Sequence, residues 1–141
     1  AVVKQIRETL GNDIIDEIAP QAQDIVIRKL KPSAFSSTPL NAFLTQLGAD
    51  SLIVTGTTTS GCVRASVIDA FSENYRVTLA EEGCFDRSEA SHAINLCDMN
   101  AKYADVVSTD EVIDHIKELP NGLFELPSGE TMGGYHQTQK T

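Results

Sequence analysis

Four short runs of apolar residues recur along the chain, each followed by a polar or glycine-containing turn. Continuous runs rich in valine, isoleucine and leucine are typical of strands buried on both faces of a parallel sheet. Segments with helical spacing lie between the runs, so strand alternates with helix as in right-handed βαβ units. The pattern therefore predicts an α/β protein with strands at 24–30, 51–56, 75–81 and 104–109.

The helices expected between these strands have recognisable ends. Thr38 can cap a helix that Gly48 terminates. Further helices are predicted at 2–10, where Gly11 is the stop, and at 61–74, 88–103 and 110–119. Ligands of parallel α/β sheets bind at the carboxyl ends of the strands. The segments that follow the first three strands are therefore the place to look for a site.

Composition limits the partners and the compartment. The formal net charge of -9 argues against a nucleic acid or an anionic membrane, because both would be repelled. No apolar run approaches the roughly 20 residues that span a bilayer. The three cysteines (62, 84 and 97) match no CxxC spacing, which favours a reducing compartment, most simply the cytoplasm. No His, Cys or Asp cluster has metal-ligand spacing, so no metal is expected.

Cys62 lies in G-T-T-T-S-G-C, at the junction between a predicted strand and a predicted helix. A helix N-terminus favours a thiolate because its free N–H dipoles stabilise an anion. Backbone amides of such a turn can also form an oxyanion hole. The alternative is a small buried residue, since free cysteine is often fully buried. The residues of the turn leave both interpretations open.

A nucleophilic cysteine needs a partner, and a lysine near the end of the first predicted strand is a candidate. Both Lys29 and Lys31 in I-R-K-L-K-P-S-A-F are placed for this role. A lysine in a cleft can stabilise a thiolate or a developing anion. A lysine near a strand end is more commonly solvated, and spacing alone does not choose between the two.

Three motifs together resemble a known family. They are K-L-K-P-S-A-F-S-S-T-P-L (29–40), G-T-T-T-S-G-C-V-R-A-S-V-I-D-A-F (56–71) and C-F-D-R-S-E-A-S-H-A-I-N-L-C-D-M-N-A-K-Y-A-D-V-V-S (84–108). The first two are similar to the isochorismatase-like cysteine hydrolases. The third resembles the branch of N-carbamoylsarcosine and maleamate amidohydrolases. The resemblance runs from about Gly11 to about Val112, which is most of the chain.

The resemblance implies a three-layer αβα sandwich with a mostly parallel sheet and an Asp–Lys–Cys triad that needs no cofactor. The family's lysine precedes the serine of S-A-F by four residues, so Lys29 is the match, and Cys62 is the nucleophile. The family's cis peptide bond corresponds to Thr57–Thr58. The oxyanion donors implied in this way are the backbone N–H groups of Thr58 and Cys62.

Arg87, in C-F-D-R, corresponds to an arginine that holds the substrate carboxylate in this branch. A guanidinium suits that role because it can bind both carboxylate oxygens. Thr58 and Thr59 could hydrogen-bond the same substrate. Without the motif, a surface arginine paired with Asp86 or Glu89 is the simpler interpretation.

The remaining reactive residues are given structural roles. Cys84 and Cys97 are predicted to be packing thiols, the second on an apolar face of a helix. His92 is predicted to be a helix-cap or interface histidine rather than a ligand. His115 and His136 have no cluster of candidate ligands around them.

The general base of the family is an aspartate on its first strand, and no D-x-Q strand motif precedes Lys29 here. The expectation is that residues 1–119 form the C-terminal portion of the hydrolase domain, without its N-terminal strand or strands, and that 120–141 form a tail. The aspartate could lie in a segment cut away, in another polypeptide, or be lost.

The predicted function is hydrolysis of a small carboxylate-bearing amide or N-carbamoyl compound through a thioester, with release of ammonia. Two alternatives remain: a catalytically inactive binding or oligomerisation module, and cysteine-independent vinyl ether hydrolysis. The resemblance also implies a homo-oligomer, commonly a tetramer in this branch, or a complementing N-terminal segment as partner.

Overall fold

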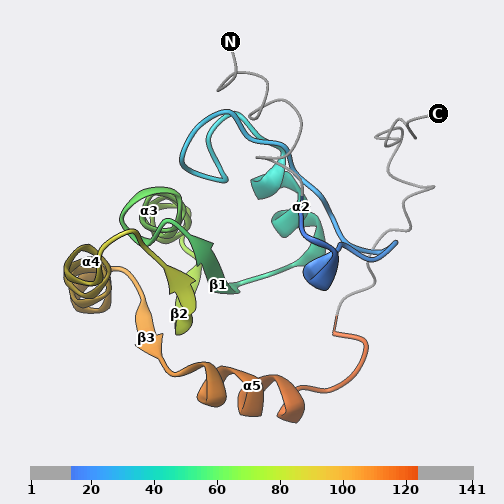
Figure 1. Cartoon of the computed structure of the whole chain (residues 1–141). Coiled ribbons are helices and arrows are strands. Elements are labelled where there is room, and N and C mark those ends of the chain that lie inside the picture. The colour runs from blue at the N-terminus through green and yellow to red at the C-terminus, as the bar shows by residue number, and fades with distance from the viewer. Residues whose placement is uncertain (1–13, 124–141) are drawn as a thin grey trace. The chain divides into compact units, whose positions relative to one another are not determined.

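Three parallel strands form the central sheet (Figure 1). In the computed structural model, which describes residues 14–123, they are β1 (Ser51–Thr57), β2 (Arg76–Phe85) and β3 (Asp105–Val107). The order is β1-β2-β3, and both neighbouring pairs are parallel. Three of the four predicted strands therefore form, and the predicted parallel α/β fold is confirmed.

The predicted strand at 24–30 is wrong for the described structure, because this run adopts no strand. Its apolar side chains are largely exposed: Ile25 by 37%, Val26 by 55% and Leu30 by 92%. An apolar run indicates a segment that can be buried, but it does not supply the partner backbone that a strand needs. Within residues 14–123, β1 pairs with β2 alone, and its other edge has no strand beside it.

β2 is longer than predicted because a bulge lies within it. Its register with β1 jumps from Val54 opposite Leu79 to Gly56 opposite Cys84. At the bulge, a Cβ atom added to Gly83 would come 3.0 Å from the side chain of Thr55, so only glycine fits without a shift. After the bulge the strand resumes, and the ends of β1 and β2 lie side by side.

The described helices are α2 (Leu40–Leu47), α3 (Arg64–Ser72), α4 (Glu89–Lys102) and α5 (Thr109–Glu118), with a short 3-10 turn, η1 (Asp16–Ile18). α2 ends at Gly48 as predicted, in the left-handed conformation with φ of 66°. Before α4, the Ser88 side chain accepts a hydrogen bond from the Ser91 amide. Before α5, Ser108 and Glu111 form a capping box.

The core lies between the sheet and the helices α3 and α4. Val67 of α3, Leu79 of β2 and Met99 of α4 are fully buried at its centre. Strand alternation turns Ala80, also buried, to the other face of β2, and α5 contacts β2 and buries Val112. In Figure 1 the sheet lies between the pair α3 and α4 and the helix α5.

The chain falls into two compact units, of which the described parts are residues 14–26 and 27–123. Everything from Lys29 through α5 belongs to the second unit. The predicted helix at 2–10 and most of the predicted tail at 120–141 lie outside the described residues. Among the helices that are described, none has the length and apolar character to cross a membrane.

Candidate active site

The turn that carries Cys62 joins β1 to α3. It begins at the peptide bond between Thr57 and Thr58, which is cis as the resemblance implies. A single wide π-helical turn, η2 (Thr59–Val63), follows, and α3 starts only at Arg64. The Thr58 carbonyl accepts hydrogen bonds from the amides of Gly61 (2.9 Å) and Val63 (3.2 Å). Cys62 thus lies in the π turn, not in the first turn of a regular α-helix as the sequence predicted. Such π turns are frequent at functional sites.

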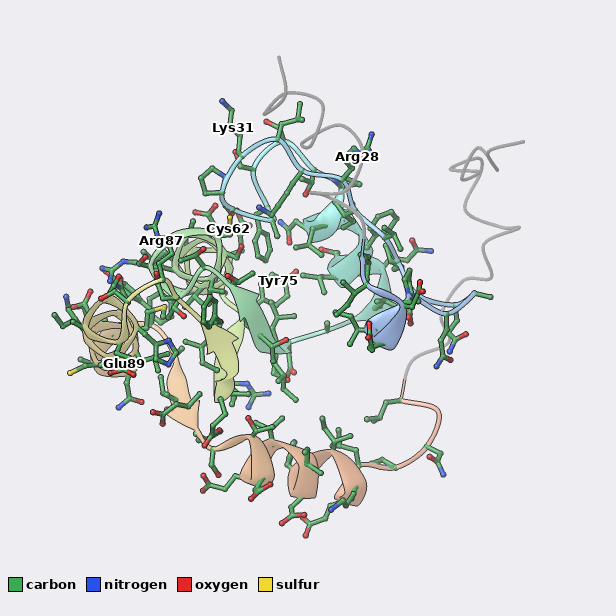
Figure 2. All side chains as sticks on the ribbon, in the orientation of Figure 1. Arg28, Lys31, Cys62, Tyr75, Arg87 and Glu89 are labelled. Atoms are coloured by element: carbon green, nitrogen blue, oxygen red, sulfur yellow. The ribbon has the colours of Figure 1, made fainter. Side chains whose placement is uncertain are left out.

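Lys29 contacts the cysteine directly. Its Nζ donates to Cys62 Sγ at 3.2 Å, and also to the carbonyl oxygens of Lys31 (3.1 Å) and Pro32 (3.0 Å). An ammonium group has three N–H donors, so two are held by its own loop and the third is aimed at sulfur. Lys31 points away from Cys62 in Figure 2. Of the two candidate lysines, the structure therefore brings only Lys29 to the thiol.

Ser66 holds this loop against the cysteine turn. Its hydroxyl accepts a hydrogen bond from the Ala34 amide (2.9 Å) and donates one to the Cys62 carbonyl (2.7 Å). One side chain of α3 thus connects the S-A-F motif to the turn. Lys29 and Cys62, which are 33 positions apart in the sequence, are thereby held in contact.

A cleft of about 440 Å³ opens beside Lys29 and Cys62 and runs along β1. The other described residues of its lining are mainly apolar and include no aspartate or glutamate: Ala34, Phe35, Leu40, Leu44, Leu52, Ile53, Val54, Thr55, Gly56, Thr57, Val63 and Ser66. Apolar walls strengthen electrostatic interactions inside a site, because they replace water. Both the lysine and the thiol face this cleft.

The opposite side of the turn is braced by the segment after β2 and by α4. The Ser60 amide donates to Asp86 Oδ2 at 2.7 Å, and the Arg87 amide donates to Asp86 Oδ1 at 2.7 Å. Thr59, which is fully buried, pairs its hydroxyl with His92 Nδ1 at 2.8 Å. The turn is thereby fixed on the side away from the cleft.

The residues predicted to bind substrate are placed differently from one another. The side chain of Arg87 is 84% exposed, with Nε 3.9 Å from Asp86 Oδ1. In Figure 2 it lies at the same end of the sheet as Cys62. Thr58 is half-buried, whereas the hydroxyl of Thr59 is directed at His92. None of these three side chains is part of the cleft lining.

The family model of the isochorismatase domain matches residues 2–111. This chain belongs to the isochorismatase family. It is 43% identical over 118 residues to N-carbamoylsarcosine amidase from Arthrobacter sp., an alignment that covers 80% of this chain and 45% of that protein. It is 36% identical over 104 residues to maleamate amidohydrolase from Pseudomonas putida, covering 74% of this chain and 49% of the relative.

Solved structures of the isochorismatase family have the same fold. An isochorismatase-like hydrolase from Alkaliphilus metalliredigens superposes with a TM-score of 0.73 at 30% identity, covering 77% of this chain and 60% of that one. The chain spans about half the length of the curated relatives it matches. Family and fold are thus established for this chain.

The other cysteines of this isochorismatase-family chain have separate surroundings. Cys84 belongs to the core, and burial raises the pKa of its thiol, which disfavours the thiolate. The prediction of a packing thiol is confirmed for Cys84. It is wrong for Cys97, which is exposed, because the inner face of α4 is occupied by Leu96 and Met99 instead.

Sequence reasoning missed the anchoring roles of Asp86 and His92. Asp86 was considered only as a surface partner of Arg87, although its side chain is fully buried. His92 does not cap α4, whose N-cap is Ser88, and its Nδ1 pairs with the Thr59 hydroxyl instead. Polar residues at 92, 95 and 98 recur at helical spacing, and Asn95 and Asp98 both bind Arg64. That spacing indicates that α4 has a polar face, but it does not indicate which part of the chain this face contacts. Within residues 14–123, no three His, Cys, Asp or Glu residues gather as metal ligands.

Proposed function

We propose that this isochorismatase-family chain supplies the cysteine and lysine of an amidohydrolase that cleaves a small carboxylate-bearing amide or N-carbamoyl compound. The 3.2 Å contact between Lys29 Nζ and Cys62 Sγ is the observation that carries the proposal. The similarity to N-carbamoylsarcosine amidase and maleamate amidohydrolase supports the substrate class.

Lys29 stabilises the thiolate of Cys62, and the thiolate attacks the carbonyl carbon of the amide. The C–S bond forms as the carbonyl π electrons move to oxygen, and the N–H groups of Thr58 and Cys62 hold that oxyanion. The intermediate collapses, the C–N bond breaks, and a proton returned by the base makes ammonia the leaving group. Water then attacks the thioester, which releases the acid and restores the thiol.

Among residues 14–123, no acidic residue lines the cleft, so the base that takes the thiol proton is not among the described lining residues. We assign this role to an aspartate on a strand beside β1. Within residues 14–123 no strand pairs with the edge of β1 away from β2, and this edge and the mainly apolar cleft along it support the assignment. A strand lying there would bring a side chain from its end towards Lys29 and Cys62.

Arg87 and the cysteine turn provide substrate recognition in this proposal. Arg87 follows β2 at the end of the sheet where Cys62 lies, and its guanidinium, although 3.9 Å from Asp86, is 84% exposed and can bind a substrate carboxylate. Thr58 adds a hydroxyl and a backbone amide. Thr59 would contribute through its backbone, since its hydroxyl is engaged by His92.

A catalytically inactive binding or oligomerisation module is the second candidate function. The described part of the chain, residues 14–123, places no acidic residue in the cleft lining, which favours it. Such a module would retain the turn and Arg87 but would bind the acid without releasing ammonia.

Compartment and assembly belong to the same proposal. Three free cysteines, one of them the exposed Cys97, suit a reducing compartment such as the cytoplasm. Ile94 on α4 is 68% exposed and Phe71 on α3 is 49% exposed. Such apolar surface suits a homo-oligomer contact.

Ammonia release from maleamate and from N-carbamoyl amino acids tests the proposal in the intact protein. Cys62→Ala is expected to lower kcat by about a thousandfold or more, as loss of a nucleophile does. Cys97→Ala, which removes an exposed thiol, is the matched control and should retain full activity. Equal rates for Cys62→Ala and the wild type would contradict the cysteine mechanism. Binding without turnover in the wild type would favour the inactive module.

A further inference from the structure

Asp86 has an unusual position for a carboxylate beside an arginine. Its side chain is completely buried, whereas the side chain of Arg87 is 84% exposed. A buried carboxylate is costly unless hydrogen bonds compensate for the lost water. Here they come from two backbone amides, Ser60 to Oδ2 and Arg87 to Oδ1, both at 2.7 Å. The Ser91 hydroxyl adds a third at 3.5 Å.

The register of the sheet explains how one carboxylate reaches both segments. Thr57, the last residue of β1, lies opposite Phe85, the last residue of β2. The cysteine turn and the segment starting at Asp86 therefore leave the sheet side by side. Each oxygen of the carboxylate serves a different segment, since Oδ2 binds the turn and Oδ1 binds Arg87.

We propose that Asp86 is a positioning residue that couples the placement of Arg87 to that of the Cys62 turn. This inference rests on the proposed function. Oδ1 holds the Arg87 backbone through a hydrogen bond from its amide, and it lies 3.9 Å from Arg87 Nε, where its charge attracts the exposed guanidinium. Oδ2 holds Ser60, two residues before the nucleophile. The distance between the attacking sulfur and the substrate carboxylate is thereby set through one side chain.

The coupling predicts a change in selectivity, not only a loss of rate. The test compares kcat/KM for maleamate with kcat/KM for its methyl ester, which lacks the carboxylate charge. Arg87→Ala should lower the ratio of the two values by about tenfold or more, since a hydrogen-bonded charge pair is lost. Asp86→Asn should lower kcat for both compounds and lower the ratio by about tenfold as well. Asparagine has a single acceptor oxygen and places an NH2 group opposite one of the two amides.

A double-mutant cycle isolates the coupling. In the Arg87→Ala background, Asp86→Asn should change the ratio by less than about twofold, because no guanidinium remains to be misplaced. Asp86→Glu is the second variant, in case the asparagine protein does not fold. It keeps both acceptors on a longer side chain, and should lower the ratio in the same way. Asp50→Asn removes an exposed carboxylate that pairs with Arg76, and serves as the control that should leave the ratio unchanged.

The outcomes separate this inference from the proposed function. Equal losses for acid and ester in Asp86→Asn and Asp86→Glu, with a lowered ratio in Arg87→Ala, overturn the coupling and leave the proposed function standing. The coupling is also overturned if the effects of Asp86→Asn and Arg87→Ala on the ratio are additive in the double-mutant cycle. Failure of the wild type to release ammonia from maleamate, from its ester and from N-carbamoyl amino acids overturns both.

Discussion

The two sides of the cysteine turn are built in different ways. On the side of α4, Asp86 holds Ser60 and His92 holds Thr59. On the side of the cleft, the wall is the edge of β1 that no described strand pairs with, its side chains are mainly apolar, and Lys29 Nζ contacts the sulfur. The difference indicates a division of roles: the α4 side fixes the shape of the turn, and in the proposed function the cleft side supplies the reacting groups.

The largest effect should come from removing the cleft-side contact. Lys29→Met keeps the length of the side chain but removes the charge beside Cys62, and kcat/KM for amide hydrolysis should fall by about a hundred- to a thousandfold. Lys31→Met removes a lysine that points away from the thiol and should change kcat/KM by less than twofold. Steady-state ammonia release measures both. Similar losses of kcat/KM in the two variants would contradict a specific role for Lys29 on the cleft side.

The free energy of unfolding should depend mainly on the core between the sheet and the helices α3 and α4. Leu79 is fully buried against α3 and α4, so Leu79→Ala should lower the free energy of unfolding by about 2–5 kcal/mol. Leu123, 51% exposed, is the matched control, and its replacement by alanine should cost less than about 0.5 kcal/mol. Denaturant unfolding of the intact protein measures the difference. A small loss for Leu79→Ala would mean that the core does not lie where the structure has it.

The smallest effect concerns acid stability on the α4 side. Lys102, and after it Arg64, hold the pKa of Asp98 below its ordinary value. The folded protein therefore binds fewer protons than the unfolded chain in the acid range, and the stabilisation is lost as pH falls below about 4. Asp98→Asn should flatten this fall in denaturant midpoints measured between pH 7 and pH 3. An unchanged slope would show that other carboxylates determine it.

The sequence predicted the parallel α/β fold because apolar runs and helix caps are local signals. Gly48 and the strand at β1 are examples. Local patterns do not report what lies beside a segment. The run at 24–30 is apolar enough for a strand but has no paired backbone, and the bulge at Gly83 extended β2 beyond its predicted end.

The pair of candidate reactive residues could be predicted from the sequence, but the hydrogen bonds that hold the cysteine turn could not. The motifs around Lys29 and Cys62, read through the family resemblance, paired two residues that the fold does bring together. The hydrogen bonds of Asp86 and His92 were not predictable, since they depend on how the end of β2 and α4 meet the turn. The π turn at Cys62 could not be predicted either, because a wide turn has no distinct residue pattern.

Mass spectrometry of the intact protein, after exposure to an aldehyde analogue of the amide substrate, tests the central claim most directly. An aldehyde accepts the attacking thiolate and has no leaving group, so it stops at the covalent adduct. The account predicts one adduct, at Cys62, formed far more slowly in Lys29→Met and absent in Cys62→Ala. An adduct on Cys97 or Cys84 with Cys62 unmodified, or no adduct at a concentration that blocks ammonia release, would contradict it.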